Sequence, residues 1–216
     1  MRISELSRLS GVSVASIKYY IREGVLAPGE SDGPNRATYG DAHLARLRLI
    51  RGLIDSAGVS VAGVKAITAA LDAGIPVNEA FGVAQSAVPL TGSSGGGAPS
   101  TGATDQVRRV IHSEMVGHPA ADVAANALDT FVAAGEPISS AWLERYAEAA
   151  AMVASADFDE LERRPDPASQ ARLVAVGTAL GDVVFQSLRR IAQATEGERR
   201  FPTPPSFRAS EQENPS

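Results

Sequence analysis

Residues 12–28 read VSVASIKYYIREGVLAP, the most specific pattern in this sequence of 216 residues. Ser13 is a residue type that starts helices and Gly24 is one that ends them, so the pattern predicts a helix over Val14–Glu23. A shorter amphipathic segment precedes this helix and stops at Gly11. Two helices separated by about three residues that include a glycine are typical of a helix-turn-helix.

The exposed side of this second helix carries cations and hydroxyl groups. Cations bind phosphates, hydroxyls donate to phosphate oxygens, and side chains near a helix start reach base edges. The pattern therefore indicates a helix that reads DNA. Taken alone, the same helix also fits a structural interpretation, in which Tyr19 and Tyr20 are half-buried and the cations form a solvated face.

The charge of the chain is divided unevenly. Residues 1–70 hold nine Lys and Arg against six Asp and Glu, a net charge of +3, whereas the whole chain has a net charge of −5. The remainder therefore carries −8. A basic N-terminal part joined to an acidic remainder predicts a polyanion-binding head and a body with a different role.

The head continues beyond the two helices. Residues 29–40 are rich in turn formers and predict a small hairpin, and two helices with apolar stripes follow it. The motifs of this region, in order, are Ile3, Gly11-Val12-Ser13, Ser16, Lys18-Tyr19-Tyr20, Gly24-Val25-Leu26-Ala27-Pro28, the hairpin, Tyr39, the apolar positions Leu44, Leu47 and Ile50, and Gly58-Val59-Ser60 before Val61. Together these motifs, over residues 1–71, resemble the MerR family of bacterial transcription regulators.

The resemblance implies a winged helix-turn-helix that binds double-stranded DNA. With the helix start included, the predicted DNA-binding residues are Ser13, Ser16, Lys18, Tyr19, Tyr20, Arg22 and, in the wing, Arg36. Lys18 stands where the family usually has Arg, which keeps the charge but loses bidentate geometry. Arg36 lies three residues before Tyr39, a departure from the family's wing. The resemblance also implies a homodimer on a two-fold operator, with RNA polymerase at the promoter.

Two segments connect the head to the rest of the chain. Residues 72–90 predict a short connecting helix that Pro89 closes. Residues 91–104, TGSSGGGAPSTGAT, have no charge and predict a flexible linker with a reach of roughly 20 Å. We expect the two halves of the chain to move independently.

Beyond the linker every segment has helical periodicity. Residues 105–197 predict an all-helical effector or dimerisation domain, a bundle, and the Pro- and Ser-rich residues 198–216 predict a disordered tail. The longest apolar stripe runs from Leu173 to Ile191, about five turns, and predicts the dimer seam. The small pair Gly177 and Gly181 would allow close helix approach there. Ordinary packing within the domain is the alternative for this stripe.

Other site types have weaker signals. Trp142 and Tyr146 are four residues apart and are candidates to line a pocket for a small-molecule effector, although buried aromatics are more often plain core. No metal site is predicted, because the chain lacks cysteine and His112 and His118 have no further ligands beside them. No cofactor motif and no catalytic constellation is present in the sequence. We therefore do not expect an enzyme.

The sequence as a whole predicts a mainly α protein, with a winged helix-turn-helix head and a C-terminal all-helical bundle. Its predicted function is sequence-specific transcription regulation of MerR type. The alternative is an architectural or protein-interaction module that binds DNA without a ligand response. No signal peptide pattern and no run of about 18 apolar residues occurs in the sequence, so we expect a cytoplasmic protein without a membrane partner.

Overall fold

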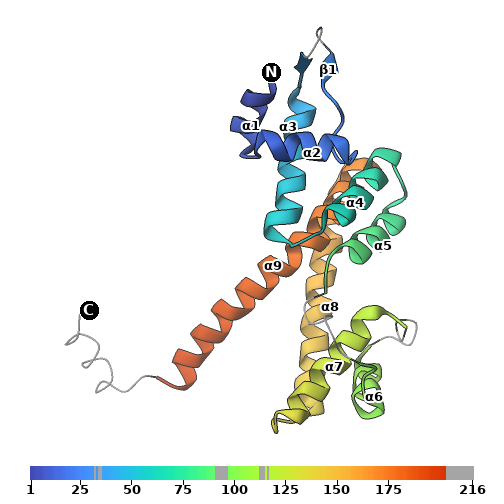
Figure 1. Cartoon of the computed structure of the whole chain (residues 1–216). Coiled ribbons are helices and arrows are strands. Elements are labelled where there is room, and N and C mark those ends of the chain that lie inside the picture. The colour runs from blue at the N-terminus through green and yellow to red at the C-terminus, as the bar shows by residue number, and fades with distance from the viewer. Residues whose placement is uncertain (32, 34–35, 91–96, 112–114, 116, 203–216) are drawn as a thin grey trace, which may run out of the picture.

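The computed structural model describes residues 1–31, 33, 36–90, 97–111, 115 and 117–202. Over these residues the chain is mainly helical, with a small hairpin near the N-terminus (Figure 1). The predicted fold class, a winged helix-turn-helix head followed by a helical C-terminal region, is confirmed. Figure 1 places the hairpin and the first helices at one end of the molecule, and the second half of the last helix extends away from them.

The head begins with the predicted pair of helices. The first three helices and the two hairpin strands are α1 (Ile3–Ser10), α2 (Val14–Arg22), β1 (Glu30–Ser31), β2 (Ala37–Thr38) and α3 (Asp41–Arg51). The strands pair antiparallel, with Glu30 opposite Thr38. Ser13 caps α2 as predicted, because its side chain accepts a hydrogen bond from the backbone N–H of Ser16.

The end of α3 passes into a second helical layer. The following elements are the π-helical turn η1 (Gly52–Ser56), α4 (Val61–Ala73) and α5 (Val77–Ala87). Arg46 of α3 forms an ion pair with Asp72 of α4, which ties the two helices together. The aliphatic core beneath these helices is fully buried and includes Leu6, Ile17, Leu47, Ile50, Leu53, Val64 and Ile67.

The described part of the C-terminal region contains the helices α6 (Thr101–Val110), α7 (Pro119–Ala133), α8 (Ser140–Glu162) and α9 (Pro167–Arg200). Helix α6 begins inside the predicted 91–104 linker, so the linker boundary is wrong by four residues. Ser100 starts the helix, and its backbone N–H and hydroxyl both donate to Asp129 of α7. These hydrogen bonds lower the pKa of Asp129. Residues 91–96 lie outside the described residues.

The other predicted C-terminal boundary is also shifted. Helix α9 continues to Arg200, so residues 198–200 are helical and not part of a disordered tail. Residues 203–216 of that predicted tail lie outside the described residues. Helix α9 begins with Asp166 as its cap and Pro167 in its first turn.

The C-terminal helices do not share one core. Helices α6 and α7 pack together around Ala103, Val107, Ala125 and Leu128, while α5, α8 and α9 meet around Ala84, Leu161 and Val174. Two residues of α9, Ala175 and Ala179, lie in the core of the head itself. The expectation that the two halves move independently is therefore wrong for α9, which belongs partly to the head.

The second half of α9 leaves this packed region. Val184, Leu188 and Ile191 are 57%, 59% and 63% exposed. They recur at helical spacing and so lie on one face of the helix. We call these three residues the α9 stripe. Figure 1 shows this part of α9 projecting from the other helices.

Candidate nucleic-acid interface

Helix α2 presents a cationic and aromatic surface. Lys18 and Arg22 are exposed, and Tyr19 is 36% exposed. The guanidinium of Arg22 lies 5.2 Å from the centroid of the Tyr19 ring, a cation–π contact that holds the two side chains side by side. Arg22 also lies 3.7 Å from the carboxylate of Glu23, an exposed pair of small energetic weight. Three of the predicted residues thus share one accessible surface.

The start of α2 carries the two predicted hydroxyl groups. The oxygens of Ser13 and Ser16 are 2.8 Å apart, and Ser13 also accepts from the Ser16 backbone N–H at 3.0 Å. Both residues therefore help to fix the helix start, where unpaired N–H groups and the helix dipole favour an anion. This arrangement suits a phosphate contact as well as a structural cap.

Tyr20 has a different environment from Tyr19. It is half-buried and packs against the core of the head. For Tyr20 this agrees with the structural interpretation of the helix given in the sequence analysis. Burial raises the pKa of Tyr20 above its usual value, and the charge of Asp55 and the neighbouring Tyr19 raise it further. The phenol therefore stays protonated at neutral pH and can act as a hydrogen-bond donor.

Arg36 belongs to the hairpin and not to the helices. It lies directly before β2, and its backbone N–H donates to the carbonyl of Gly33 at 3.1 Å. Its side chain is exposed. The hairpin is fixed to the start of the chain, because the N–H of Tyr39 donates to the carbonyl of Met1 at 2.9 Å. Arg36 is thus an accessible cation on an anchored wing.

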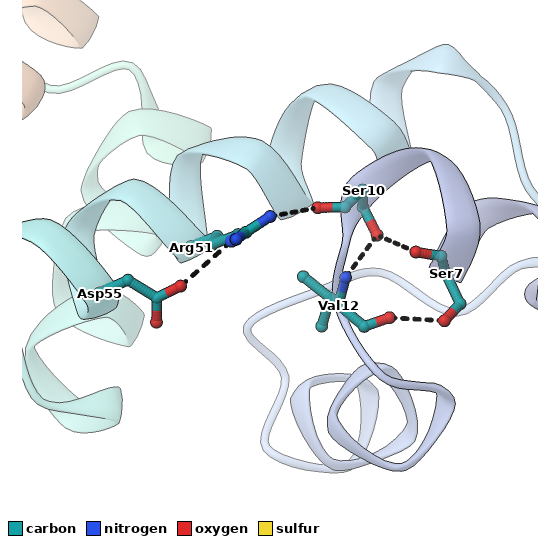
Figure 2. A network of polar contacts seen from close by, with 5 residues as sticks. All are labelled: Ser7, Ser10, Val12, Arg51 and Asp55. Atoms are coloured by element: carbon teal, nitrogen blue, oxygen red, sulfur yellow. Dashed lines mark hydrogen bonds and ion pairs between the residues drawn. The ribbon is translucent and has the colours of Figure 1, made fainter.

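A polar network that the sequence pattern does not reveal sets the position of α2 (Figure 2). The hydroxyl of Ser7 donates to the carbonyl of Val12 at 2.7 Å, and the N–H of Val12 donates to the hydroxyl of Ser10 at 3.3 Å. Arg51 of α3 donates to the carbonyl of Ser10 at 3.3 Å and to Asp55 at 3.1 Å. Arg51 therefore links α3 to the end of α1, just before α2 begins.

Gly11 makes this network possible and provides a test of it. Its φ of +68° is a left-handed conformation, and a Cβ there would lie 2.3 Å from the Arg51 guanidinium. We expect Gly11→Ala to lower the free energy of unfolding by about 2 kcal/mol, since left-handed alanine costs roughly 1 kcal/mol and displacement of Arg51 adds about as much. Urea denaturation measures this loss.

Gly24 offers a matched control, because its φ is +72° but a Cβ there would meet nothing within 4 Å. Gly24→Ala should lower the free energy of unfolding only by the cost of a left-handed alanine, about 1 kcal/mol. In an Arg51→Ala background the two glycine substitutions should cost the same. Equal costs in the wild-type background would contradict a role for Arg51 at the end of α1.

The second predicted site, Trp142 and Tyr146 of α8, is occupied by protein groups. The two rings stack with centroids 3.7 Å apart. Arg189 of α9 lies 5.3 Å from the Tyr146 ring centroid and donates to its hydroxyl, with the Nε atom at 3.2 Å. This arrangement joins α8 to α9. The effector role of Trp142 and Tyr146 stays a prediction.

Metal binding has no support in the part of the chain that the structure describes. Among those residues no group of three or more His, Cys, Asp and Glu is placed to hold a metal ion. His118 starts α7, where its Nδ1 accepts the N–H of Ala120 at 3.2 Å. His112 lies outside the described residues.

The comparison with protein families decides the nature of the head. The family profile described as MerR HTH family regulatory protein matches residues 1–71. Residues 1–71 are a MerR-family helix-turn-helix domain. The match coincides with α1 to most of α4, and so includes α2, the hairpin and the Arg51 network.

Two known proteins resemble the chain. The HTH-type transcriptional regulator HmrR of Sinorhizobium medicae (strain WSM419) is 39% identical over 69 residues, which are 32% of this chain and 46% of that regulator. The chain thus matches less than half the length of this curated relative. The crystal structure of SCO5550 from Streptomyces coelicolor A3(2), described as a candidate transcriptional regulator, covers 94% of this chain and 99% of its own, with 28% identity and a TM-score of 0.66. This second similarity extends beyond the MerR-type head to the C-terminal helices.

Proposed function

We propose that this protein is a sequence-specific transcription regulator that binds a two-fold operator as a dimer. The observation that carries the proposal is the surface of α2, where Lys18, Tyr19 and Arg22 are accessible together on a MerR-type head. In a helix-turn-helix the second helix enters the major groove, and cations and aromatic groups on it contact phosphates and base edges. The proposed contacts include Ser13, Ser16, Tyr20 and Arg36 at the edges of this surface.

The dimer part of the proposal rests on the α9 stripe. Val184, Leu188 and Ile191 form an exposed apolar face on a helix of 34 residues. By length and composition alone α9 could also cross a membrane. Its first half, however, contributes Ala175 and Ala179 to the core of the head, so this part of α9 packs against the other helices of the chain. A second copy of α9 would cover the stripe and would place two heads on one two-fold DNA site.

Single substitutions on α2 test the DNA contacts. Tyr19→Ala and Arg22→Ala should each weaken binding to an operator selected from genomic fragments by about 1–3 kcal/mol, with unchanged helical content. Arg22→Ala should also reduce the slope of log affinity against log salt by about one, because one phosphate contact is lost. Fluorescence anisotropy over a salt series and far-UV circular dichroism measure both quantities.

Arg108→Ala on α6 is the control for charge, since it removes one exposed cation outside the head. It should leave the affinity almost unchanged. Folded Tyr19→Ala and Arg22→Ala proteins that bind as well as Arg108→Ala would show that α2 does not contact the operator. Tyr20 is unsuitable for this test, because its half-buried ring also supports the core.

The remaining partners belong to the same proposal. A cytoplasmic regulator of this kind would act on RNA polymerase at the promoter and would respond to a small-molecule effector. Transcription in vitro from the selected promoter, with and without the protein, separates this function from that of an architectural module. The regulator changes transcript yield at protein concentrations that occupy the operator, whereas the architectural module occupies the DNA without such a change.

A further inference from the structure

A cavity of about 720 Å³ lies where α5, the start of α7, α8 and α9 come together. This volume is within the range of roughly 300–1,000 Å³ that is typical of small-molecule sites. The predicted aromatic pair Trp142 and Tyr146 does not line it. Gly177 and Gly181 of α9 do, and a Cβ at either position would meet nothing within 4 Å. These two glycines therefore leave space open in the cavity.

The walls of the cavity are largely aromatic and aliphatic. Phe81 of α5 stacks on Phe158 of α8, with ring centroids 5.2 Å apart and planes 27° apart. Phe185 of α9 and Val153 of α8 add further apolar surface. Three phenylalanine rings from three helices thus line one space, which favours a ligand with a flat or bulky apolar body.

The charged groups of the lining have one sign. Asp157 of α8 and Asp182 of α9 are carboxylates, and neither has a hydrogen bond or ion pair with any described residue. No Lys or Arg is among the described residues that line the cavity. His118, which also lines the cavity, accepts the N–H of Ala120 at Nδ1. The start of α7 contributes only about half a positive charge, which two full carboxylate charges outweigh.

We propose that this cavity binds an amphipathic organic cation. The apolar body of the ligand would lie against Phe81, Phe158 and Phe185, and its cationic centre would be held by Asp157 and Asp182. Aromatic faces also attract a cation directly, so both kinds of wall favour the same ligand class. Binding of the cation to the cavity requires no DNA. Only the role of this ligand as an effector of transcription rests on the proposed function.

Two ions of the same shape and opposite charge test the ligand class. In isothermal titration calorimetry with the full-length protein, tetraphenylphosphonium should bind at least about ten-fold more tightly than tetraphenylborate, because the carboxylates attract the first and repel the second. Equal binding of the two ions, or no binding of either, overturns the proposal.

Variants of the lining locate the site. Asp157→Asn combined with Asp182→Asn should weaken tetraphenylphosphonium binding by about ten-fold or more. The control is Asp159→Asn combined with Glu162→Gln, which removes two charges from exposed positions of α8 outside the lining. This control should bind the ion as the wild type does. Equal affinities of the two double variants would place binding elsewhere and overturn the site.

A filling variant tests the cavity without changing charge. Gly177→Leu should abolish binding, while Gly197→Leu, at an open position near the end of the same helix, should leave it intact. Equal binding by these two variants also overturns the site. Arg22→Ala should keep full tetraphenylphosphonium affinity, so the ligand proposal and the DNA-binding proposal fail or succeed separately.

Discussion

Ala179→Glu is expected to unfold the DNA-binding head, although residue 179 lies in the last helix of the chain. Ala179 is 1% exposed and belongs to the same core as Ile17, Leu47 and Val64. A carboxylate buried there without a partner costs about 3–5 kcal/mol, a large part of the roughly 5–15 kcal/mol that stabilises a domain. Operator binding should be lost together with the urea unfolding transition of the head.

Ala150→Glu on α8 is the control, since Ala150 is exposed. It should change the free energy of unfolding by less than about 0.5 kcal/mol. Ala179→Val gives an intermediate case, with overpacking expected to cost about 1–3 kcal/mol and DNA binding retained. If Ala179→Glu and Ala150→Glu unfold at the same urea concentration, α9 is not part of the head.

Leu188→Glu combined with Ile191→Glu should convert the proposed dimer into a folded monomer. Both residues are exposed on the α9 stripe and contribute nothing to the cores of the described chain, so the fold should persist. Two heads held together on one operator bind about 10²–10⁴-fold more tightly than a single head. The variant should therefore bind the operator more weakly than the wild type by a factor of that order. Sedimentation and operator titration measure the two effects.

Gln186→Glu combined with Gln193→Glu adds the same two charges on the opposite side of α9. This control should remain dimeric with full operator affinity. Binding to a DNA fragment with a single half-site should be the same for both variants. A stripe variant that still sediments as a dimer would place the seam outside the α9 stripe. Leu180 is a poorer position for such a test, because it is half-buried next to Ala179.

The head could be predicted in detail because its signals are local. Ser13, Gly11 and Gly24 act through the backbone of their own segment, and the structure has α2 begin and end where they indicate. The role of Arg51 could not be predicted in this way. Its partner is the carbonyl of Ser10, 41 residues earlier, and only the packing of α1 on α3 brings the two together.

The C-terminal region was harder to predict because its periodicity shows helices but not their neighbours. The stripe of α9 was identified from large residues such as Leu188, whereas the contact with the head is made by Ala175 and Ala179. Alanine is common both on exposed helix faces and on close-packed ones. The positions of alanine in the sequence therefore do not show which face of α9 is buried. The cavity was missed for a similar reason, since Phe81, Phe158 and Phe185 come from three separate helices.

The place of Ala175 and Ala179 in the head's core also has a consequence for the order in which the protein is made. A ribosome releases α1 to α4 long before α9, so during synthesis the head lacks part of its core. Contacts between such distant parts of a chain form slowly, because a large loop must first be closed. We therefore expect the nascent head to remain incompletely folded, and unable to occupy DNA, until nearly the whole chain has emerged.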